Sequence, residues 1–246
     1  MTTATGFVAR LMRGEFLAHL RVRTTLLLQE LPLRRLLRQR SATPDIELIS
    51  AARKFSMLHD DVLRLLWTFA ETSRGAVLEL GPYIGGSTVV IASAARKGGA
   101  GPVVTVEKGG AYRDHPHVPT DDILADLRKN LNRHGVLDAV HIVEGENDAP
   151  ESIDAVRKAL GGAQVDLFFV DSDGRVDRDF RIYEPYLMDN CIIMFDDYES
   201  NWAAAKARLV RPWVDAAVAS GKVRNLGVYG WGTWVGQYLG HRVLSE

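Results

Sequence analysis

The chain of 246 residues contains a single cysteine, Cys191, and has no excess of charge of either sign. One cysteine excludes a disulfide framework within the chain. Because this cysteine begins the apolar run Cys191–Phe195, we expect a buried thiol in a reducing environment. With 30 basic and 31 acidic side chains, the formal net charge is −1, which gives no overall electrostatic reason to bind nucleic acid.

The sequence also lacks a long hydrophobic run. No apolar stretch reaches the roughly 18 residues that a membrane-spanning helix requires. Residues 1–20 show neither the hydrophobic region nor the cleavage site of a secretory signal peptide. We therefore expect a soluble, cytoplasmic protein without a membrane span.

The charges are nevertheless unevenly distributed, because residues 1–40 carry eight arginines and only two glutamates. Leucines recur among these arginines, which predicts one or two amphipathic helices broken near Pro32. Such helices could contact a membrane surface or an acidic partner. We favour a cap or a homodimer interface, because Trp and Phe are not enriched. We accordingly divide the chain into a helical extension, residues 1–58, and a main domain, residues 59–246.

From residue 46 onward, helical and strand periodicities alternate. Helices are predicted at 46–55, 60–72, 87–95, 121–134, 151–160, 177–187 and 202–219. Strands are predicted at 76–80, 103–106, 141–143, 165–170, 191–195, 222–228 and 233–238. This order predicts an α/β fold: a mostly parallel, Rossmann-like sheet of seven strands, covered on both faces, with an antiparallel C-terminal hairpin.

A glycine-rich turn, Gly81–Gly86, follows the first predicted strand and leads into a helix. It lacks the Gly-Lys-Ser/Thr of a phosphate loop, and its spacing differs from Gly-x-Gly-x-x-Gly. A turn between a strand and a helix N-terminus is where α/β proteins hold nucleotide-like cofactors. Glu79, two residues before the first glycine, suits a cofactor with a cationic or hydroxyl-rich end. S-adenosylmethionine (SAM) is therefore the first candidate.

Carboxylates follow or close five successive predicted strands: Glu79, Glu107, Glu144, Asp171 and Asp196. The carboxyl ends of parallel strands meet at one edge of a sheet, where ligands bind. Glu107 is placed to accept the hydroxyls of a ribose. Asp171, Asp196 and Asp197 could converge on Mg²⁺, or the last two could simply cap a helix or end a strand in a turn.

These segments resemble a known family. The stretch Leu78–Ser87 is similar to motif I of class I SAM-dependent methyltransferases. The stretches 165–171 and 192–198 resemble the metal-dependent O-methyltransferase branch, which includes catechol O-methyltransferase-like and macrolide-sugar O-methyltransferase-like enzymes. The resemblance covers about residues 60–240. It implies methyl transfer from SAM to a hydroxyl of a small molecule, such as a natural product, a sugar or a catechol-like compound.

The resemblance also implies roles for individual residues. The methionine end of SAM would be lined by Glu79, Gly81, Tyr83, Gly85, Gly86 and Ser87. The ribose would be held by Glu107, and the adenine would be bordered by Gly145, Glu146 and Asn147. Mg²⁺ would be bound by Asp171, Asp196 and Asp197. Asp171 is also the candidate catalytic residue.

The chain departs from the family at Gly174, where related enzymes often carry His or Lys. The next residue, Arg175, stays charged and is a poor proton acceptor. The long 108–120 loop offers His115 and His117, which either fold over the pocket or are solvated on a surface loop. The departure leaves two alternatives open: a metal-independent O- or N-methyltransferase, or an inactive methyltransferase-fold partner protein.

Four aromatic side chains are expected near the substrate side of the strand-end rim and could shape the acceptor pocket: Tyr198, Trp202, Trp231 and Trp234. Trp231 and Trp234 could equally belong to the core of the C-terminal hairpin. The acceptor itself is not specified by these residues.

Overall fold

The computed structural model describes residues 31–199 and 203–240. Contacts divide the chain into two units, Met1–Gln39 and Arg40–Glu246. In the first unit, residues 31–38 are helical; the helices predicted before residue 31, and Trp202, lie outside the described residues. The second unit includes helix α2 (Ile46–Ala52) and a 3₁₀ turn. The sequence had grouped residues 40–58 with the extension, whereas the contacts assign them to the main unit.

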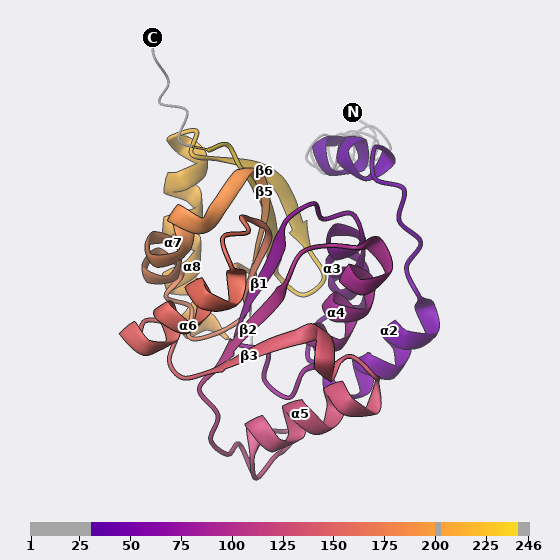
Figure 1. The fold of residues 1–246 in the computed structure, drawn as a ribbon. Helices are drawn as coiled ribbons and strands as arrows, with labels where there is room; N and C mark the ends of the chain where they lie inside the picture. The colour runs from indigo at the N-terminus through magenta and orange to yellow at the C-terminus, as the bar shows by residue number, and fades with distance from the viewer. Residues whose placement is uncertain (1–30, 200–202, 241–246) are drawn as a thin grey trace, which may run out of the picture. The chain divides into compact units, whose positions relative to one another are not determined.

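The second unit is built on a seven-stranded sheet in the order β3-β2-β1-β4-β5-β7-β6 (Figure 1). Its strands are β1 (Ala76–Leu80), β2 (Val103–Glu107), β3 (Val140–Glu144), β4 (Val165–Val170), β5 (Leu187–Phe195), β6 (Val223–Tyr229) and β7 (Thr233–Tyr238). The first five strands pair in parallel, and β7 runs antiparallel to both β5 and β6. The predicted Rossmann-like α/β sheet with an antiparallel C-terminal hairpin is confirmed.

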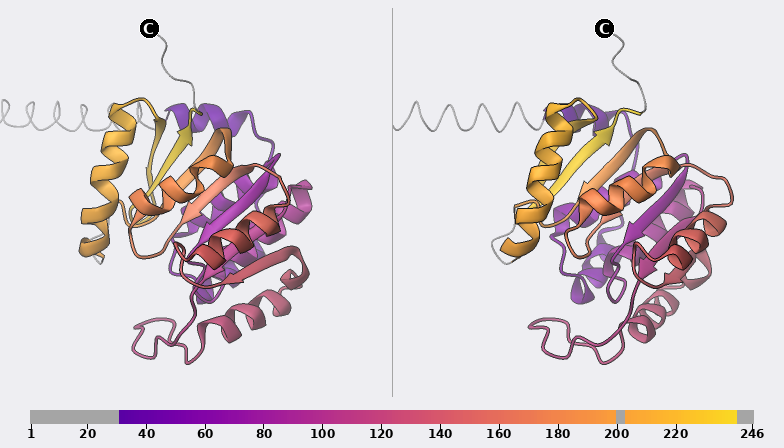
Figure 2. Two further views of the ribbon diagram at one scale, coloured as in Figure 1. Left: turned by 60° about the vertical axis from the view of Figure 1, so that its left-hand side comes forward. Right: turned by 90° about the vertical axis from the view of Figure 1, so that its left-hand side faces the viewer.

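Helices cover both faces of this sheet (Figures 1 and 2). One face carries α2, α3 (Asp60–Glu71), α4 (Gly86–Gly98) and α5 (Ile123–Arg133). The other carries α6 (Pro150–Leu160), α7 (Val176–Tyr183) and α8 (Ala204–Ala219). Because both faces are covered, β1, β2 and β4 are buried along their whole length, as near-continuous apolar strands require.

The core on the α6–α8 side is rich in aromatic rings. Phe168 and Phe195 meet edge to face with their ring centroids 6.2 Å apart, and Phe195 stacks on Trp234 with a centroid distance of 5.7 Å. Trp234 is 1% exposed, and its indole N–H donates to Asn225 over 2.9 Å. Trp234 therefore belongs to the hairpin core and not to an acceptor pocket. Cys191 is fully buried, as predicted.

The predicted helix 177–187 is wrong at its C-terminal end. Helix α7 stops at Tyr183, a 3₁₀ turn spans Glu184–Tyr186, and β5 begins at Leu187. Pro185 lies within this 3₁₀ turn, and a proline has no N–H to continue an α-helix and disfavours helical geometry in the residue before it.

Among the residues that the structure describes, no helix has both the length and the apolar character needed to cross a bilayer.

Candidate cofactor and metal site

The ends of three central strands are held level by backbone hydrogen bonds. The amide of Asp171 donates to the carbonyl of Leu80 over 2.9 Å. The amide of Asp196 donates to the carbonyl of Val170 over 3.0 Å. Parallel pairing thus continues one residue beyond β4 and β5. As a result, the predicted acids after these strands share one edge of the sheet with the glycine-rich turn after β1.

The glycine-rich turn passes close to the end of β4. Gly81 has φ +82°, and a Cβ on it would lie 2.1 Å from the carbonyl oxygen of Asp171. Only glycine accommodates both this conformation and this close approach. Tyr83 is also left-handed, with φ 53°, which is uncommon for a residue with a bulky side chain. The conformation of the turn is therefore tightly constrained, and the turn packs directly against Asp171, one of the predicted metal ligands.

Glu79 is completely buried beneath this turn. Its carboxylate accepts hydrogen bonds from the hydroxyls of Ser87 (2.5 Å), Thr88 (2.7 Å) and Thr105 (3.1 Å). Burial raises the pKa of Glu79, although the three hydroxyl donors oppose the shift. Glu79 thus ties the N-terminus of α4 to β2.

Glu107, at the end of β2, links two loops. One carboxylate oxygen accepts from the amide of Tyr83 over 3.0 Å, and the other accepts from the amide of Gly109 over 2.9 Å. Burial raises its pKa, while these backbone donors oppose the shift. The amide of Gly145 donates to the carbonyl of Glu107 over 2.9 Å. These bonds bring the predicted ribose and adenine residues side by side.

The side chains of the two residues after Gly145 lie in different environments. Glu146 is exposed and pairs with Lys108 at 3.6 Å. Asn147 is buried; its side-chain amide nitrogen donates to Asp179 over 3.2 Å, and its backbone carbonyl accepts from the Tyr183 hydroxyl over 2.8 Å. Asn147 therefore fixes the loop after β3 onto α7 through both its side chain and its backbone.

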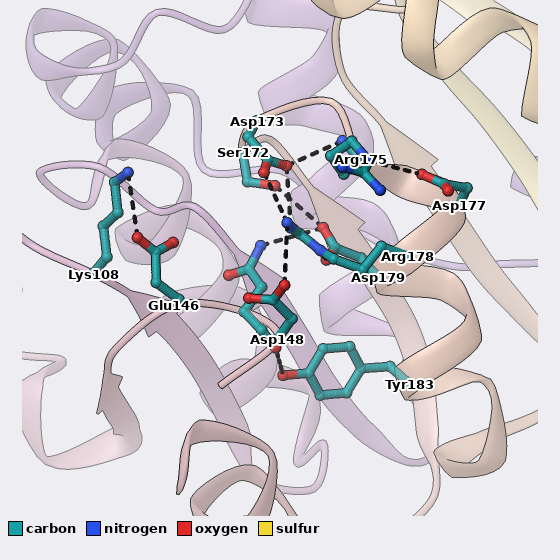
Figure 3. Close-up of polar contacts among 11 residues, drawn as sticks. Lys108, Glu146, Asp148, Ser172, Asp173, Arg175, Asp177, Arg178, Asp179 and Tyr183 are labelled. Carbon is teal, nitrogen blue, oxygen red and sulfur yellow. Dashed lines mark hydrogen bonds and ion pairs between the residues drawn. The ribbon is translucent and has the colours of Figure 1, made fainter. Parts of the chain in front are cut away.

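Arg178 on α7 is the centre of an ionic cluster that the sequence did not reveal. It contacts Asp173 at 2.9 Å, Asp179 at 2.8 Å and Asp148 at 3.6 Å, as Figure 3 shows. Asp179 is fully buried, and burial raises its pKa against the opposing effect of Arg178. The cluster joins the loops after β3 and β4, which border the predicted adenine position.

Asp171, Asp196 and Asp197 form the predicted acidic cluster. Each offers a carboxylate oxygen, and these atoms lie within 4.8 Å of one another. Asp196 accepts a short hydrogen bond from the hydroxyl of Thr233 on β7. Desolvation and then the negative charge of Asp196 raise the pKa of Asp171 well above its ordinary value. Asp197 adopts φ 59°. The prediction that these three carboxylates lie close together is confirmed.

Lys206 on α8 extends into this cluster. Its ammonium nitrogen lies 3.1 Å from a carboxylate oxygen of Asp197 and 3.9 Å from one of Asp171. Burial lowers the pKa of Lys206, but attraction by Asp171 and Asp197 exceeds that effect, so its pKa is raised. The helical pattern of residues 202–219 did not distinguish Lys206 from other surface lysines. Its partners, Asp171 and Asp197, follow strands β4 and β5 and lie outside this helical segment.

The 108–120 loop lies against the glycine-rich turn. The Tyr83 hydroxyl donates to the carbonyl of Val118 over 2.5 Å. His115 is 7% exposed, and its Nδ1 accepts the amides of His117 (3.2 Å) and Val118 (2.9 Å). Burial and then His117 lower the pKa of His115. His117 is exposed, as a solvated loop histidine would be, whereas His115 is not: its Nδ1 organises the loop.

The remaining aromatic candidates differ in environment. Trp231 is 58% exposed and lies beside Arg53, whose guanidinium is 4.9 Å from the ring centroid, and His59, at 5.3 Å. The Tyr198 hydroxyl donates to Asp215 over 2.8 Å. Of the aromatic candidates that the structure describes, Trp231 is therefore the most exposed.

Residues 78–198 match a family model described as a methyltransferase domain. This region begins in β1 and ends at Tyr198, so it contains every predicted site residue except two aromatic candidates on the hairpin and Trp202. Comparison with curated proteins gives no sequence match.

Solved structures share the fold. The chain is similar to the cofactor-bound protein Rv0187 from MTB, with a TM-score of 0.56, 22% identity, and coverage of 79% of this chain and 87% of that chain. It is also similar to the O-methyltransferase TomG from Streptomyces achromogenes, which is involved in tomaymycin synthesis and was solved with SAM (TM-score 0.55, 17% identity, 81% and 92% covered). A third similar structure is the O-methyltransferase from Bacillus cereus in complex with SAH, with a TM-score of 0.55, 17% identity, and coverage of 80% of this chain and 92% of that chain. The similarity confirms the predicted methyltransferase fold.

Proposed function

We propose that the chain is a class I SAM-dependent methyltransferase that methylates a hydroxyl oxygen of a small molecule with the help of a divalent cation. The observation that carries this proposal is the acidic cluster of Asp171, Asp196 and Asp197. It lies directly beside the glycine-rich turn expected to hold the methyl donor. Structural relatives named as O-methyltransferases support oxygen as the acceptor atom.

The donor side of the site is preorganised by the chain itself. Glu107 is held by two backbone amides, so its carboxylate is fixed where a ribose is expected to donate its hydroxyls. Glu79 holds the start of α4 through Ser87 and Thr88, which keeps the turn in shape. We assign the methionine end of SAM to this turn and the adenine to the loop at 145–147.

The acidic cluster fits a small, hard cation. Mg²⁺ binds oxygen ligands at about 2.0–2.1 Å, so its ligands lie roughly 3–4 Å apart. The carboxylate oxygens here lie within 4.8 Å of one another. Asp171, Asp196 and Asp197 would hold the ion, with Asp196 oriented by Thr233. When bound, the cation would lower the pKa of the acceptor hydroxyl and fix its oxygen.

Methyl transfer needs the acceptor oxygen, the methyl carbon and the sulfonium sulfur in line. The oxygen–carbon bond forms as the carbon–sulfur bond breaks, and the hydroxyl proton must leave. We assign Asp171 to take that proton, as a carboxylate of the acidic cluster that would lie beside the acceptor hydroxyl. Gly174 and Arg175 offer no alternative in the adjacent loop.

Replacing one acid separates donor binding from chemistry. Asp196→Asn keeps the shape of the side chain and its contact with Thr233, but it removes a charge from the cluster. We expect methyl transfer to a panel of hydroxylated acceptors to be abolished, while SAM affinity measured by calorimetry changes less than about threefold. The matched control, Asp215→Asn, alters an exposed acid bonded to Tyr198 and should leave both quantities unchanged.

Three results would contradict this proposal at different points. Absence of SAM binding would contradict the proposed methyltransferase activity as a whole. Turnover that survives a chelator would contradict the role of the cation and favour the metal-independent alternative. Loss of SAM affinity in Asp196→Asn would mean that the acidic cluster belongs to the donor site.

A further inference from the structure

A lysine is the partner of the acidic cluster in this structure. Lys206 lies 3.1 Å from Asp197 and 3.9 Å from Asp171. These side chains are largely shielded: that of Asp197 is 14% exposed, that of Asp171 20% and that of Lys206 38%. An ion pair with this degree of burial is weakly screened by salt and interacts more strongly than a surface pair.

The start of α8, where Lys206 lies, passes close to Gly174. This glycine has φ +83°, and a Cβ built on it would lie 3.1 Å from both Cα and Cβ of Lys206. A histidine or lysine, which the family resemblance led us to expect at this position, would push against the start of α8 and would be strained by the left-handed backbone. Gly174 thus lets the first turn of α8, which carries Lys206, lie against the loop after β4.

The charges in the cluster follow from this arrangement. Three carboxylates and one ammonium give a formal charge of −2, from −3 and +1, instead of −3. A divalent cation bound to the same carboxylates experiences repulsion from the ammonium if Lys206 stays. If Lys206 moves away, the ion pair with Asp197 is lost. Either outcome lowers the affinity for the cation.

We propose that Lys206 is a tethered cation that competes with a divalent metal ion for Asp171, Asp196 and Asp197, and so sets the metal affinity of the site. The proposal rests on the proposed function in one respect, namely that the acidic cluster is the metal site. Lys206 is a positioning residue here: it acts through the carboxylates and is not assigned any contact with the reacting atoms.

Direct metal titration tests this role without relying on activity. Lys206→Met removes the charge and keeps an unbranched, mostly apolar side chain of similar length. We expect Mn²⁺, followed by calorimetry or by the electron paramagnetic resonance of the free ion, to bind this variant about tenfold more tightly, or more, than the native chain. Lys206→Arg retains the charge and should bind Mn²⁺ no more than about threefold more tightly than the native chain.

The chain offers a matched control in Lys222, which is 42% exposed, pairs with Glu184 at 2.9 Å and follows the C-terminal end of α8. Because α8 rises about 1.5 Å per residue, its last residue, Ala219, lies roughly 20 Å from Lys206, and Lys222 follows that end of the helix. Lys222→Met should change Mn²⁺ affinity by less than about twofold. Thermal unfolding of each variant checks folding, and Lys206→Gln replaces Lys206→Met if the latter does not fold.

The outcomes separate the two proposals. Equal Mn²⁺ affinity in the native chain, Lys206→Met and Lys206→Gln would overturn the role of Lys206 and leave the metal site intact. No Mn²⁺ binding in any variant, with chelator-resistant methyl transfer, would overturn the metal site itself and the competition with it. Tighter binding in Lys206→Arg than in Lys206→Met would also contradict a role based on charge.

Discussion

Glu79 is the residue at which burial of an ionisable group has the clearest consequences. In the native chain its carboxyl accepts three hydroxyl hydrogen bonds in a position with no solvent exposure. Glu79→Gln would force an amide N–H₂ group toward at least one of these hydroxyls. We expect the free energy of unfolding in urea to fall by about 1–3 kcal/mol at pH 5. Thr105→Val, which removes only one donor, should cost about 1 kcal/mol.

The same residue gives a pH dependence with a defined sign. Burial raises the pKa of Glu79 above its ordinary value of 4.5. Above that ordinary value the unfolded chain has released the proton while the folded chain retains it, so stability falls as pH rises toward the folded-state pKa. The stability advantage of the native chain over Glu79→Gln should therefore shrink between pH 4 and pH 8 in urea titrations. An advantage that grows with pH would show that Glu79 is stabilised as an ion.

Sequence reasoning identified the acids of the site but missed their partners. The acids follow buried strands, so their meeting at one edge could be predicted from the parallel order alone. Thr105, Thr233 and Lys206 come from other elements, and single polar residues in a strand or helix carry no local signal of what they face. Their roles depend on how strands and helices pack, which periodicity does not encode.

At the scale of elements, the 108–120 loop is held to the glycine-rich turn by one strong contact. The Tyr83 hydroxyl donates to the Val118 carbonyl over 2.5 Å. Tyr83→Phe removes this bond and should destabilise the chain by about 0.5–1.5 kcal/mol. We expect faster hydrogen exchange of the loop amides, because local opening becomes easier. Tyr112→Phe is the control: its side chain is 49% exposed, and its hydroxyl has no hydrogen bond to a described residue. An equal effect of both variants would refute this role for Tyr83.

Element boundaries were predictable where apolar periodicity was strong. Strands β1, β4 and β7 span the predicted residues, and they are buried along their length. The error fell at α7, which ends at Tyr183 before Pro185. There the helical pattern of apolar residues continued past the proline into β5, so spacing alone suggested a longer helix.

At the scale of the whole molecule, the second unit contains the sheet, both helix layers and all the acids of the site. A chain beginning at Arg40 should therefore unfold cooperatively and bind SAM. With SAM at about 100 times its dissociation constant, we expect the unfolding free energy of both the full and the shortened chain to rise by about 2.7 kcal/mol. Stabilisation of the full chain alone would assign part of the donor site to residues 1–39. Light scattering on the two chains tests the predicted homodimer.

The contact between Gly174 and Lys206 links two positions that are 32 residues apart in sequence. A Cβ at position 174 would lie only 3.1 Å from Cα and Cβ of Lys206, so a larger side chain there would press on the first turn of α8. Substitutions at the two positions are therefore expected to be inherited together. Relatives with histidine or lysine at the first position should carry a small or uncharged residue at the second, and an alignment would reveal this as covariation.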